Sequence, residues 1–198
     1  MGVRILTSVG EAVRPHLPAL ARLRMTVFRD YPYLYDGDKG YEQRYLEAYA
    51  RSRRSVFVLA LDGEEVVGCS TGIPLVDEVP AIQQPFVERG MVLSEVFYFG
   101  ESVLLPAYRG QGIGHRFFDA REHHARLLHG YRWTAFCAVE RAANDSRQPP
   151  GYRPNDAFWT ARGYQRQDDM FCTLDWTETG ALESTRHRLR FWLRPLDA

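Results

Sequence analysis

A Gly-rich stretch in the middle of the chain carries the clearest chemistry in this sequence. Residues 106–114 read Pro-Ala-Tyr-Arg-Gly-Gln-Gly-Ile-Gly, with a glycine at every second position from 110 onward. The apolar run that precedes it, residues 96–105, has the length and the branched or aromatic character of a buried strand. Residues 117–128 then place apolar side chains at helical spacing, with Asp119, Arg121, Glu122 and Arg126 at the polar positions between them. The pattern predicts a strand, a glycine turn and an amphipathic helix.

This junction is suited to binding an anion. The first N–H groups of a helix have no partner within the helix and lie at the positive end of its dipole. Glycines at 110, 112 and 114 let a diphosphate approach those groups closely, and Arg109 adds a permanently charged donor. A Walker loop is excluded by the spacing and by the missing lysine, and a dinucleotide fingerprint by His115, where a glycine is required. We therefore expect a pyrophosphate-binding loop.

The same stretch resembles the acetyl-CoA-binding motif of the GNAT superfamily of N-acetyltransferases, in which Arg-Gly-x-Gly-x-Gly follows a strand that ends in an apolar residue and a proline. The resemblance implies that acetyl-CoA (coenzyme A) is the co-substrate and that no metal takes part. It implies that the pyrophosphate is held by Arg109, Gly110, Gln111, Gly112, Ile113, Gly114 and His115. It also implies that the pantetheine and the acyl carbonyl pair with backbone groups of Val103, Leu104 and Leu105.

The rest of the chain fits one α/β domain over residues 1–198. Its hydrophobic share of 45% and charged share of 25% are ordinary for a soluble globular protein of this length. The predicted strands are 3–7, 55–61, 66–74, 96–105, 133–139, 170–176 and 187–193, and the predicted helices are 11–28, 41–50, 117–128 and 156–162. This order is similar to the GNAT fold, an α/β (α+β) arrangement. Such a fold has a mixed central sheet of about six to seven strands, splayed between strands four and five, and about four flanking helices.

Two carboxylates are candidates for the catalytic base. An alkylammonium is cationic at neutral pH, so its attack on a thioester needs a base, which the resemblance places on the fourth strand. Glu101 stands inside the apolar run, where an unpaired carboxylate would be costly, and it is the favoured candidate. The alternative for Glu101 is a salt bridge to an arginine of a neighbouring helix, or exposure at a bulge. Glu95 is the second candidate, and its alternative is a structural position at the entrance of the strand.

Trp159 is the main departure from the family pattern. Many GNAT enzymes have a tyrosine four residues before the glycine that closes the penultimate helix, and here that position, counted from Gly163, holds Trp159. An indole is no acid at neutral pH, so the leaving thiolate would take its proton from a nearby tyrosine such as Tyr152 or from water, or activity is weak. We expect Trp159 to line the pantetheine channel. The departure leaves open a non-catalytic acyl-CoA-binding or regulatory module on the same fold.

A tyrosine-rich segment is the candidate acceptor site. Tyr31, Tyr33 and Tyr35 precede Asp36 and Asp38, at the place where GNAT proteins commonly bind the acceptor. Aromatic faces beside carboxylates suit a cationic or aromatic amine. The alternative is an aromatic-packed loop with a solvated acidic rim. The expected reaction is N-acetylation of a primary amine on a small-molecule or peptide acceptor that the sequence does not identify.

Charge, cysteine and histidine content argue against a protein that binds nucleic acid, membranes or metal, or that is held by disulfides. The 25 basic and 25 acidic residues cancel, which argues against nucleic-acid or membrane partners. The three cysteines are widely spaced and the histidines at 123, 124 and 129 do not pair on one helical face, so we expect neither disulfides nor a metal site. We expect a cytoplasmic protein, because no signal or membrane-spanning stretch is present. A homodimer that uses residues 191–193 is left open.

Overall fold

The computed structural model describes residues 2–196 and forms a mixed α/β structure around an eight-stranded sheet. The strands lie in the order β1-β2-β3-β4-β6-β8-β7, and β5 pairs with β3 beside this path. They are β1 Arg4–Val9, β2 Val56–Asp62, β3 Glu65–Pro74, β4 Val96–Tyr98, β5 Ser102–Leu104, β6 Trp133–Val139, β7 Gln165–Thr177 and β8 Ser184–Pro195. The α-helices of the described residues are α1 Leu17–Phe28, α2 Lys39–Arg51, α3 Pro80–Glu88, α4 Ile113–Leu128 and α5 Asp156–Ala161.

The predicted fold class is confirmed, with two additional elements. The apolar run 96–105 was expected as one strand, but it breaks at Gly100 and Glu101 and forms the two short strands β4 and β5. The segment 75–92, which has no regular pattern, contains α3. Only glycine fits at position 100, since a Cβ atom there would clash with the hydroxyl groups of Tyr49 and Thr71.

The helix expected over residues 11–28 is divided. A 3-10 helix spans Gly10–His16, and α1 begins only at Leu17. Proline lacks the N–H that an interior helical position needs, so Pro18 is accommodated in the first turn of α1, where no such bond is required. The two C-terminal strands are longer than the patterns 170–176 and 187–193 predicted, because β7 and β8 pair along most of their length.

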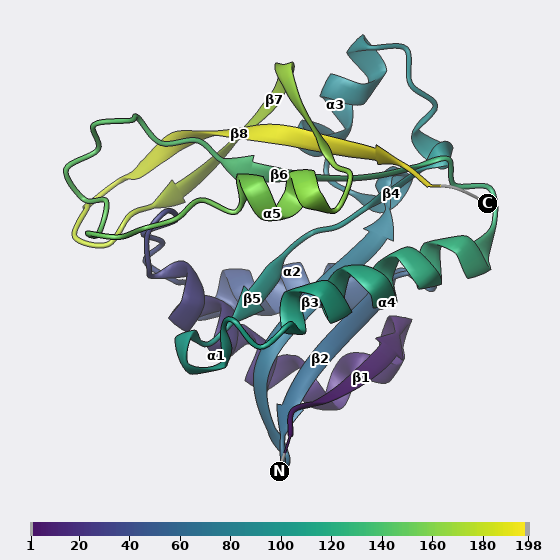
Figure 1. Ribbon diagram of the computed structural model, residues 1–198, viewed down its shortest axis with the longest axis horizontal. Coiled ribbons are helices and arrows are strands. Elements are labelled where there is room, and N and C mark those ends of the chain that lie inside the picture. Colours follow the sequence, from purple (N-terminus) through teal and green to yellow (C-terminus); the bar gives the residue numbers. More distant parts are fainter. Residues whose placement is uncertain (1, 197–198) are drawn as a thin grey trace.

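The sheet opens between β5 and β6. β4 runs parallel to β6 over Val96–Tyr98, and the N–H of Phe99 makes the last bond across this boundary, 2.7 Å from the carbonyl oxygen of Ala135. Beyond Phe99 the chain continues as β5, which pairs with β3, while β6 continues along β8 (Figure 1). The predicted splay between the fourth and fifth strands is therefore present, and its apex lies at Phe99.

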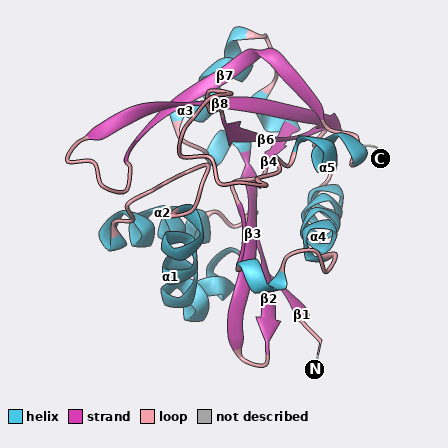
Figure 2. Cartoon of the chain, turned by 60° about the vertical axis from the view of Figure 1, so that its left-hand side comes forward, coloured by secondary structure: helices cyan, strands magenta, loops and turns pink. Residues whose placement is uncertain are grey.

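Helices cover both faces of the sheet. In Figure 2, α1 and α2 lie on one side of β1–β3 and α4 lies on the other. Two clusters of buried side chains fill these layers. Leu20, Leu46 and Leu59 belong to the cluster under α1 and α2, whereas Val58 and Phe117 belong to the one under α4. The strands on both sides of the splay are therefore held in place by packed side chains on each face of the sheet.

Candidate active site

The opening between β5 and β6 leads into a cleft of about 1630 Å³. The cleft extends from the Gly-rich loop, past β5 and α5, to the segment 30–33. It brings together ten of the residues that the sequence singled out: Tyr31, Tyr33, Glu101, Leu104, Arg109, Gly110, Gly112, Gly114, His115 and Trp159. Six others do not line it: Tyr35, Glu95, Val103, Leu105, Gln111 and Ile113.

The Gly-rich loop presents free amides at the start of α4. Gly110 and Gly112 have φ angles of 75° and 77°, in the left-handed region that glycine adopts without strain, and Gly112 caps α4 in that conformation. The N–H of Arg116 bonds the carbonyl of Gly112, so residues 113–115 precede the first full helical bond of α4 and their amides lack helical partners. The exposed Arg109 donates from Nε to the carbonyl of Leu104, 3.2 Å away, which keeps its guanidinium beside the loop. This arrangement suits an anion.

The backbone of β5 exposes alternate residues to the cleft. The N–H of Thr71 bonds the carbonyl of Glu101, and the N–H of Leu105 bonds the carbonyl of Val67, each at 3.0 Å. Backbone groups of successive strand residues point to opposite sides, so Glu101 and Leu105 face β3 and so does Val103 between them. Ser102 and Leu104 therefore direct their backbone groups toward the cleft. Of the three residues predicted to pair with pantetheine, only Leu104 directs its backbone groups toward the cleft, and Ser102 is a further candidate that the sequence reasoning missed.

Glu101 lies at the apex of the opening in a buried ionic network. Its side chain is 4% exposed, and its Oε2 lies 2.7 Å both from Nη1 of Arg24 on α1 and from the hydroxyl of Tyr45 on α2. Its Oε1 is buried and has no hydrogen-bond partner within residues 2–196. The salt bridge to an arginine of a neighbouring helix, which was the alternative expected from the sequence, is thus present, and the residue also lines the cleft.

Arg24 carries the positive charge of this network. It bonds both Glu101 and Glu42, and Glu42 is completely buried. Burial by itself would lower the pKa of the Arg24 guanidinium, but the charges of Glu101, Tyr45 and Glu42 outweigh burial and raise that pKa well above its ordinary value. Arg24 is therefore charged at neutral pH.

Glu95 occupies a different part of the molecule. It ends the short 3-10 helix Leu93–Glu95 before β4, and its carboxylate lies 3.4 Å from Nη1 of Arg132. Because the splay begins at the other end of β4, Glu95 and Glu101 do not share a site. The structure agrees with the structural alternative for Glu95, a position at the strand entrance.

Trp159 forms part of the aromatic wall of the cleft. Its ring centroid lies 5.0 Å from that of Phe136 and 5.2 Å from that of Trp192. Tyr152 also lines the cleft and packs edge-on against Tyr31, with 4.7 Å between the ring centroids. Burial raises the pKa of the Tyr152 phenol, so it is protonated at neutral pH. A phenol is therefore present in the cleft, although position 159 does not supply it.

The segment that carries Tyr31 and Tyr33 is held by Arg141, a residue that no sequence pattern singled out. Arg141 donates from Nε to the carbonyl of Pro32 at 2.6 Å and from Nη2 to the carbonyl of Tyr33 at 3.0 Å. Its Nη1 lies 2.5 Å from Oε1 of Glu178, a residue in the connection between β7 and β8. Tyr35 lies beyond this contact and its backbone pairs with Glu178. Tyr31 and Tyr33 thus remain as acceptor-site candidates, and Tyr35 serves the attachment of the loop.

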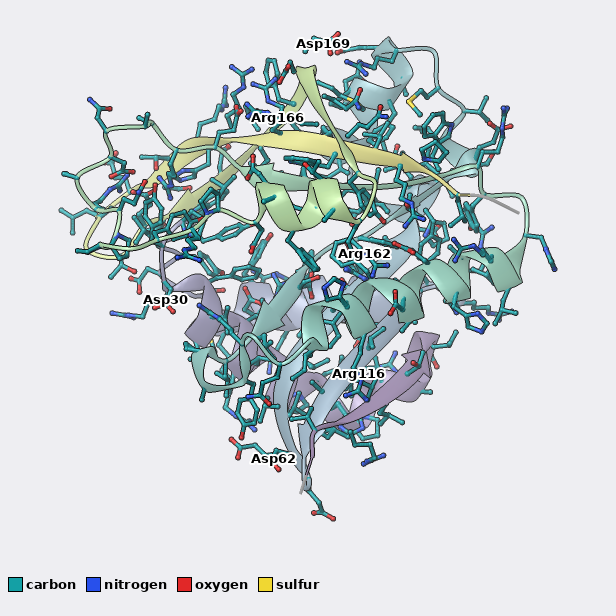
Figure 3. All side chains as sticks on the ribbon, viewed as in Figure 1. Asp30, Asp62, Arg116, Arg162, Arg166 and Asp169 are labelled. Atoms are coloured by element: carbon teal, nitrogen blue, oxygen red, sulfur yellow. The ribbon has the colours of Figure 1, made fainter. Side chains whose placement is uncertain are left out.

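Two buried charged residues of α4 complete the surroundings of the cleft. Glu122 is 4% exposed and accepts from Arg162 at 3.1 Å, an arginine that lies between α5 and α4 in Figure 3. Arg121 is 1% exposed and lines the cleft. Both were expected at polar, solvent-facing positions of the helix, and that expectation was wrong. Their neighbours Phe117, Phe118 and Ala125 are buried, so residues 121 and 122 fall in the middle of the buried stripe.

Residues 2–196 have neither a metal-binding cluster nor a membrane-spanning helix. No group of three or more His, Cys, Asp or Glu side chains in this range is arranged to hold a metal ion. No helix of the same range is long and apolar enough to cross a membrane.

Comparison with known proteins places this geometry in a family. The sequence pattern of the acetyltransferase (GNAT) family matches residues 20–148, more than half of the chain. No curated protein matches the sequence. Among solved structures, the chain is similar to a ribosomal-protein-alanine N-acetyltransferase from Brucella melitensis, with 17% identity, 96% of this chain and 99% of the other covered, and a TM-score of 0.62.

A second similar structure is a phosphinothricin acetyltransferase from Sinorhizobium meliloti in complex with AcCoA, with 16% identity and a TM-score of 0.61. The match covers 99% of this chain and 89% of the other. A third is an N-acetyltransferase from Staphylococcus aureus Mu50, with 14% identity and a TM-score of 0.60. The match covers 98% of this chain and 99% of the other. At these identities the likeness shows a shared fold.

Proposed function

The chain belongs to the acetyltransferase (GNAT) family, and we propose that it transfers an acetyl group from acetyl-CoA to a primary amine of a small-molecule or peptide acceptor by direct attack. The observation that carries this proposal is the continuous cleft, which joins the free amides at the start of α4 to Glu101 and to the tyrosines of the segment 30–33. An acyl donor bound at one end and an amine bound at the other would meet at the apex of the splay.

The residues of the cleft suit the parts of acetyl-CoA. The amides of residues 113–115 and the guanidinium of Arg109 would hold the pyrophosphate. The backbone groups of Ser102 and Leu104 would pair with the amide-bearing pantetheine arm, and Trp159 would enclose it. When bound, the thioester supplies an electrophilic acyl carbon. Complexes of related folds with AcCoA, such as the Sinorhizobium meliloti enzyme, support this assignment.

Glu101 is the base in this proposal. Its Oε2 is engaged by Arg24 and Tyr45, whereas Oε1 has no partner and is the atom available to accept a proton, directly or through one water molecule. Glu95 is not carried into the proposal because it lies outside the cleft. The proton for the leaving thiolate would come from Tyr152 or from water.

The acceptor end of the cleft favours a cationic or aromatic amine. Tyr31 and Tyr33 line this end together with the exposed Asp30, so that aromatic rings and a carboxylate border the same space. Two of the similar structures are named for acetyl transfer to the alanine of a ribosomal protein and to phosphinothricin, which are a peptide and a small molecule. We therefore keep both sizes of acceptor in the proposal.

A non-catalytic acyl-CoA-binding module is the second candidate. Two observations favour it: the ion pair between Glu101 and Arg24, which occupies half of the proposed base, and the indole of Trp159 in place of a phenol. Such a module would bind acetyl-CoA but would not release thiol in the presence of amines.

A thiol-release assay separates the two candidates. Purified protein is mixed with acetyl-CoA and with tyramine, spermidine or a short peptide that has a free N-terminus, and free CoA is followed with a thiol reagent. The proposal predicts amine-dependent release with at least one of these amines, strongly reduced in Glu101→Gln and retained in the matched Glu95→Gln. Binding of acetyl-CoA without amine-dependent release from any of them would favour the non-catalytic module.

A further inference from the structure

Arg121 is a buried cation whose hydrogen-bonding capacity is only partly used. Its Nε donates to the carbonyl of Phe117, and its Nη1 donates to the carbonyls of Thr71 and Glu101, each at 3.2 Å. Its Nη2 is buried and has no partner among the described residues. All three bonds go to neutral backbone oxygens, and no carboxylate between residues 2 and 196 forms an ion pair with the guanidinium.

The charge of Arg121 persists in this environment. Burial lowers the pKa of its guanidinium to about 10, and the groups of Tyr164, Glu101 and Glu122 oppose that shift. Arg121 is therefore still a cation at neutral pH. A buried charge without a directly bonded counterion is costly to a folded protein, and an unpaired donor adds to that cost. Such an arrangement is expected where a ligand supplies the missing acceptor.

The guanidinium stands at the apex of the splay. Its central carbon lies 4.2 Å from the ring centroid of Phe99 and 4.7 Å from that of Phe118. Phe99 makes the last bond between the two diverging strands, and both rings and Arg121 line the cleft. Arg121, whose Nη2 has no partner among the described residues, thus lies beside the apex.

Glu101, whose Oε1 has no partner among the described residues, lies beside the same apex and bonds to the other layer. Oε1 of Glu101 belongs to a carboxylate that bonds to α1 and α2, whereas Arg121 projects from α4, and these helices cover opposite faces of the sheet (Figure 2). A carbonyl group and an amine that meet at the apex would require one donor for the carbonyl oxygen and one acceptor for the amine proton. The two unpartnered atoms match these requirements.

We propose that Nη2 of Arg121 donates a hydrogen bond to the carbonyl oxygen of the bound acyl thioester and stabilises the negative charge that this oxygen acquires during transfer. This inference rests on the proposed function. The backbone N–H of Ser102, which faces the cleft, is the second donor to the same oxygen. A charged donor in a water-excluded site is an effective stabiliser of such an oxyanion.

The transfer step balances with these residues. The lone pair of the neutral amine forms the new N–C bond, and the π electrons of the carbonyl move to the oxygen that faces Arg121. The nitrogen releases its proton to Oε1 of Glu101, directly or through water. The oxyanion then re-forms the carbonyl, and the C–S bond breaks with its electron pair on sulfur. The thiolate takes a proton from Tyr152 or from water.

A purely structural role for Arg121 makes different predictions. In that case its bonds to Thr71 and Glu101 would only tie α4 to the break between β4 and β5. Removing the guanidinium would then lower stability and activity, but it would not change how strongly the protein distinguishes a ligand with a carbonyl oxygen from one without it.

The test compares acetyl-CoA with S-ethyl-CoA, a thioether that lacks the carbonyl oxygen. We expect the wild-type protein to bind acetyl-CoA about tenfold or more tightly in calorimetric titrations, because the difference reports a hydrogen bond to a charged donor. Arg121→Lys keeps a cation that can reach the backbone carbonyls but lacks the second nitrogen of the fork. We expect this variant to lose most of the preference, to keep its affinity for S-ethyl-CoA within about twofold, and to lower kcat by about 10²–10³-fold.

Arg116→Lys is the matched control. Arg116 lies on the same helix, is exposed, donates to the carbonyl of Val3 and does not line the cleft, and Figure 3 shows it toward β1. This control should leave the preference for acetyl-CoA unchanged. If Arg121→Lys retains the wild-type preference, Arg121 does not bind the carbonyl and the inference is wrong.

A spectroscopic measurement on the wild-type protein covers the case in which Arg121→Lys does not fold. The infrared stretch of acetyl-CoA labelled with ¹³C at the carbonyl should move to lower wavenumber on binding than in water, since a charged donor polarises the bond. A stretch at or above the value in water would overturn the inference. If the wild-type protein binds neither ligand, the proposed function itself fails, and this result is distinct from binding without a carbonyl preference.

Discussion

The carboxylate of Glu101 lies 2.7 Å from Nη1 of Arg24, and the same guanidinium bonds Glu42, so one buried cation faces two buried carboxylates. This arrangement ties α1 and α2 to the break between β4 and β5. It fixes the orientation of Glu101 and leaves Oε1 without a partner. A carboxylate in this position combines a structural contact with an acceptor atom at the apex of the splay.

Glu101→Gln should lower turnover while leaving the binding of CoA intact. An amide has nearly the same shape but cannot serve as a base, so we expect kcat to fall by about 10²–10⁴-fold and the pH dependence of kcat to change. Steady-state kinetics across a pH series would measure both effects. Glu95→Gln, the same change outside the cleft, is the control. A pH profile identical to that of the wild-type protein would remove Glu101 as the base.

Arg109→Ala should weaken the binding of CoA. The exposed guanidinium beside the Gly-rich loop is expected to bond the pyrophosphate, and a hydrogen bond to a charged group contributes about 1.5–3 kcal/mol. Calorimetric titration with CoA would measure the loss. Arg116→Ala removes the same charge from a position that does not line the cleft and should have little effect. An affinity of Arg109→Ala equal to that of the control would contradict the assignment of the loop.

Arg141→Gln should affect the acceptor and not the acyl donor. The substitution removes the bonds from the guanidinium to the carbonyls of Pro32 and Tyr33, which hold the segment that borders the acceptor end. We expect the KM of a reactive amine to rise by about tenfold, since positioning of the reacting groups is lost, while the KM of acetyl-CoA stays within about twofold.

Arg186→Gln is the control for this experiment, because Arg186 lies exposed on β8 with Asp175 as its partner, away from the cleft. Equal changes in the two KM values of Arg141→Gln would indicate a general loss of structure. No change in either value would show that the bonds from Arg141 do not determine the acceptor site.

His124 should contribute to a loss of stability in mild acid. Its Nε2 lies 2.9 Å from the carbonyl oxygen of Arg54, and burial lowers the pKa of the imidazole below its ordinary value of 6.5. The unfolded chain therefore takes up this proton at a higher pH than the folded protein does. The free energy of unfolding should decrease as the pH falls from about 6.5 through the lowered pKa. Burial lowers the pKa of His187 as well, which adds to the same slope.

Chemical denaturation at about pH 7.5 and about pH 5.5 would measure this contribution. The difference between the two free energies of unfolding should be smaller in His124→Gln than in the wild-type protein. His123→Gln, at the exposed neighbouring position of α4, should retain most of the wild-type difference, because the charge of His123 is only a minor cause of the lowered pKa of His124. An unchanged difference in His124→Gln would show that this imidazole is not responsible.

Local patterns in the sequence predicted those parts of the protein that depend on near neighbours. The strand, glycine turn and helix around Gly112 are set by residues within a few positions of one another, and all three are present, although α4 begins at Ile113 and not at the predicted residue 117. The splay, which the family resemblance implied, is also present. The polar side of α4 was misjudged because charged residues were read as solvent-facing. The pair Phe117 and Phe118 defines a buried stripe that includes Arg121 and Glu122.

Contacts across long sequence separations could not be read in the same way. Arg24 precedes the Glu101 that it contacts by 77 positions, and Arg141 follows Tyr33 by 108 positions. Neither arginine differs in local pattern from the many other arginines of the chain, so their roles depend on tertiary packing. The alternation of backbone bonds in β5 likewise depends on its register with β3, which the sequence alone did not fix, and this is why Ser102 was missed.

The most direct test of the account is a calorimetric titration of the purified protein with acetyl-CoA, followed by free CoA. The amides at the start of α4, the guanidinium of Arg109 and the open edge of β5 predict one binding site per chain with micromolar affinity for both ligands. Absence of binding at millimolar concentrations of either ligand would contradict the central claim that this cleft binds acetyl-CoA.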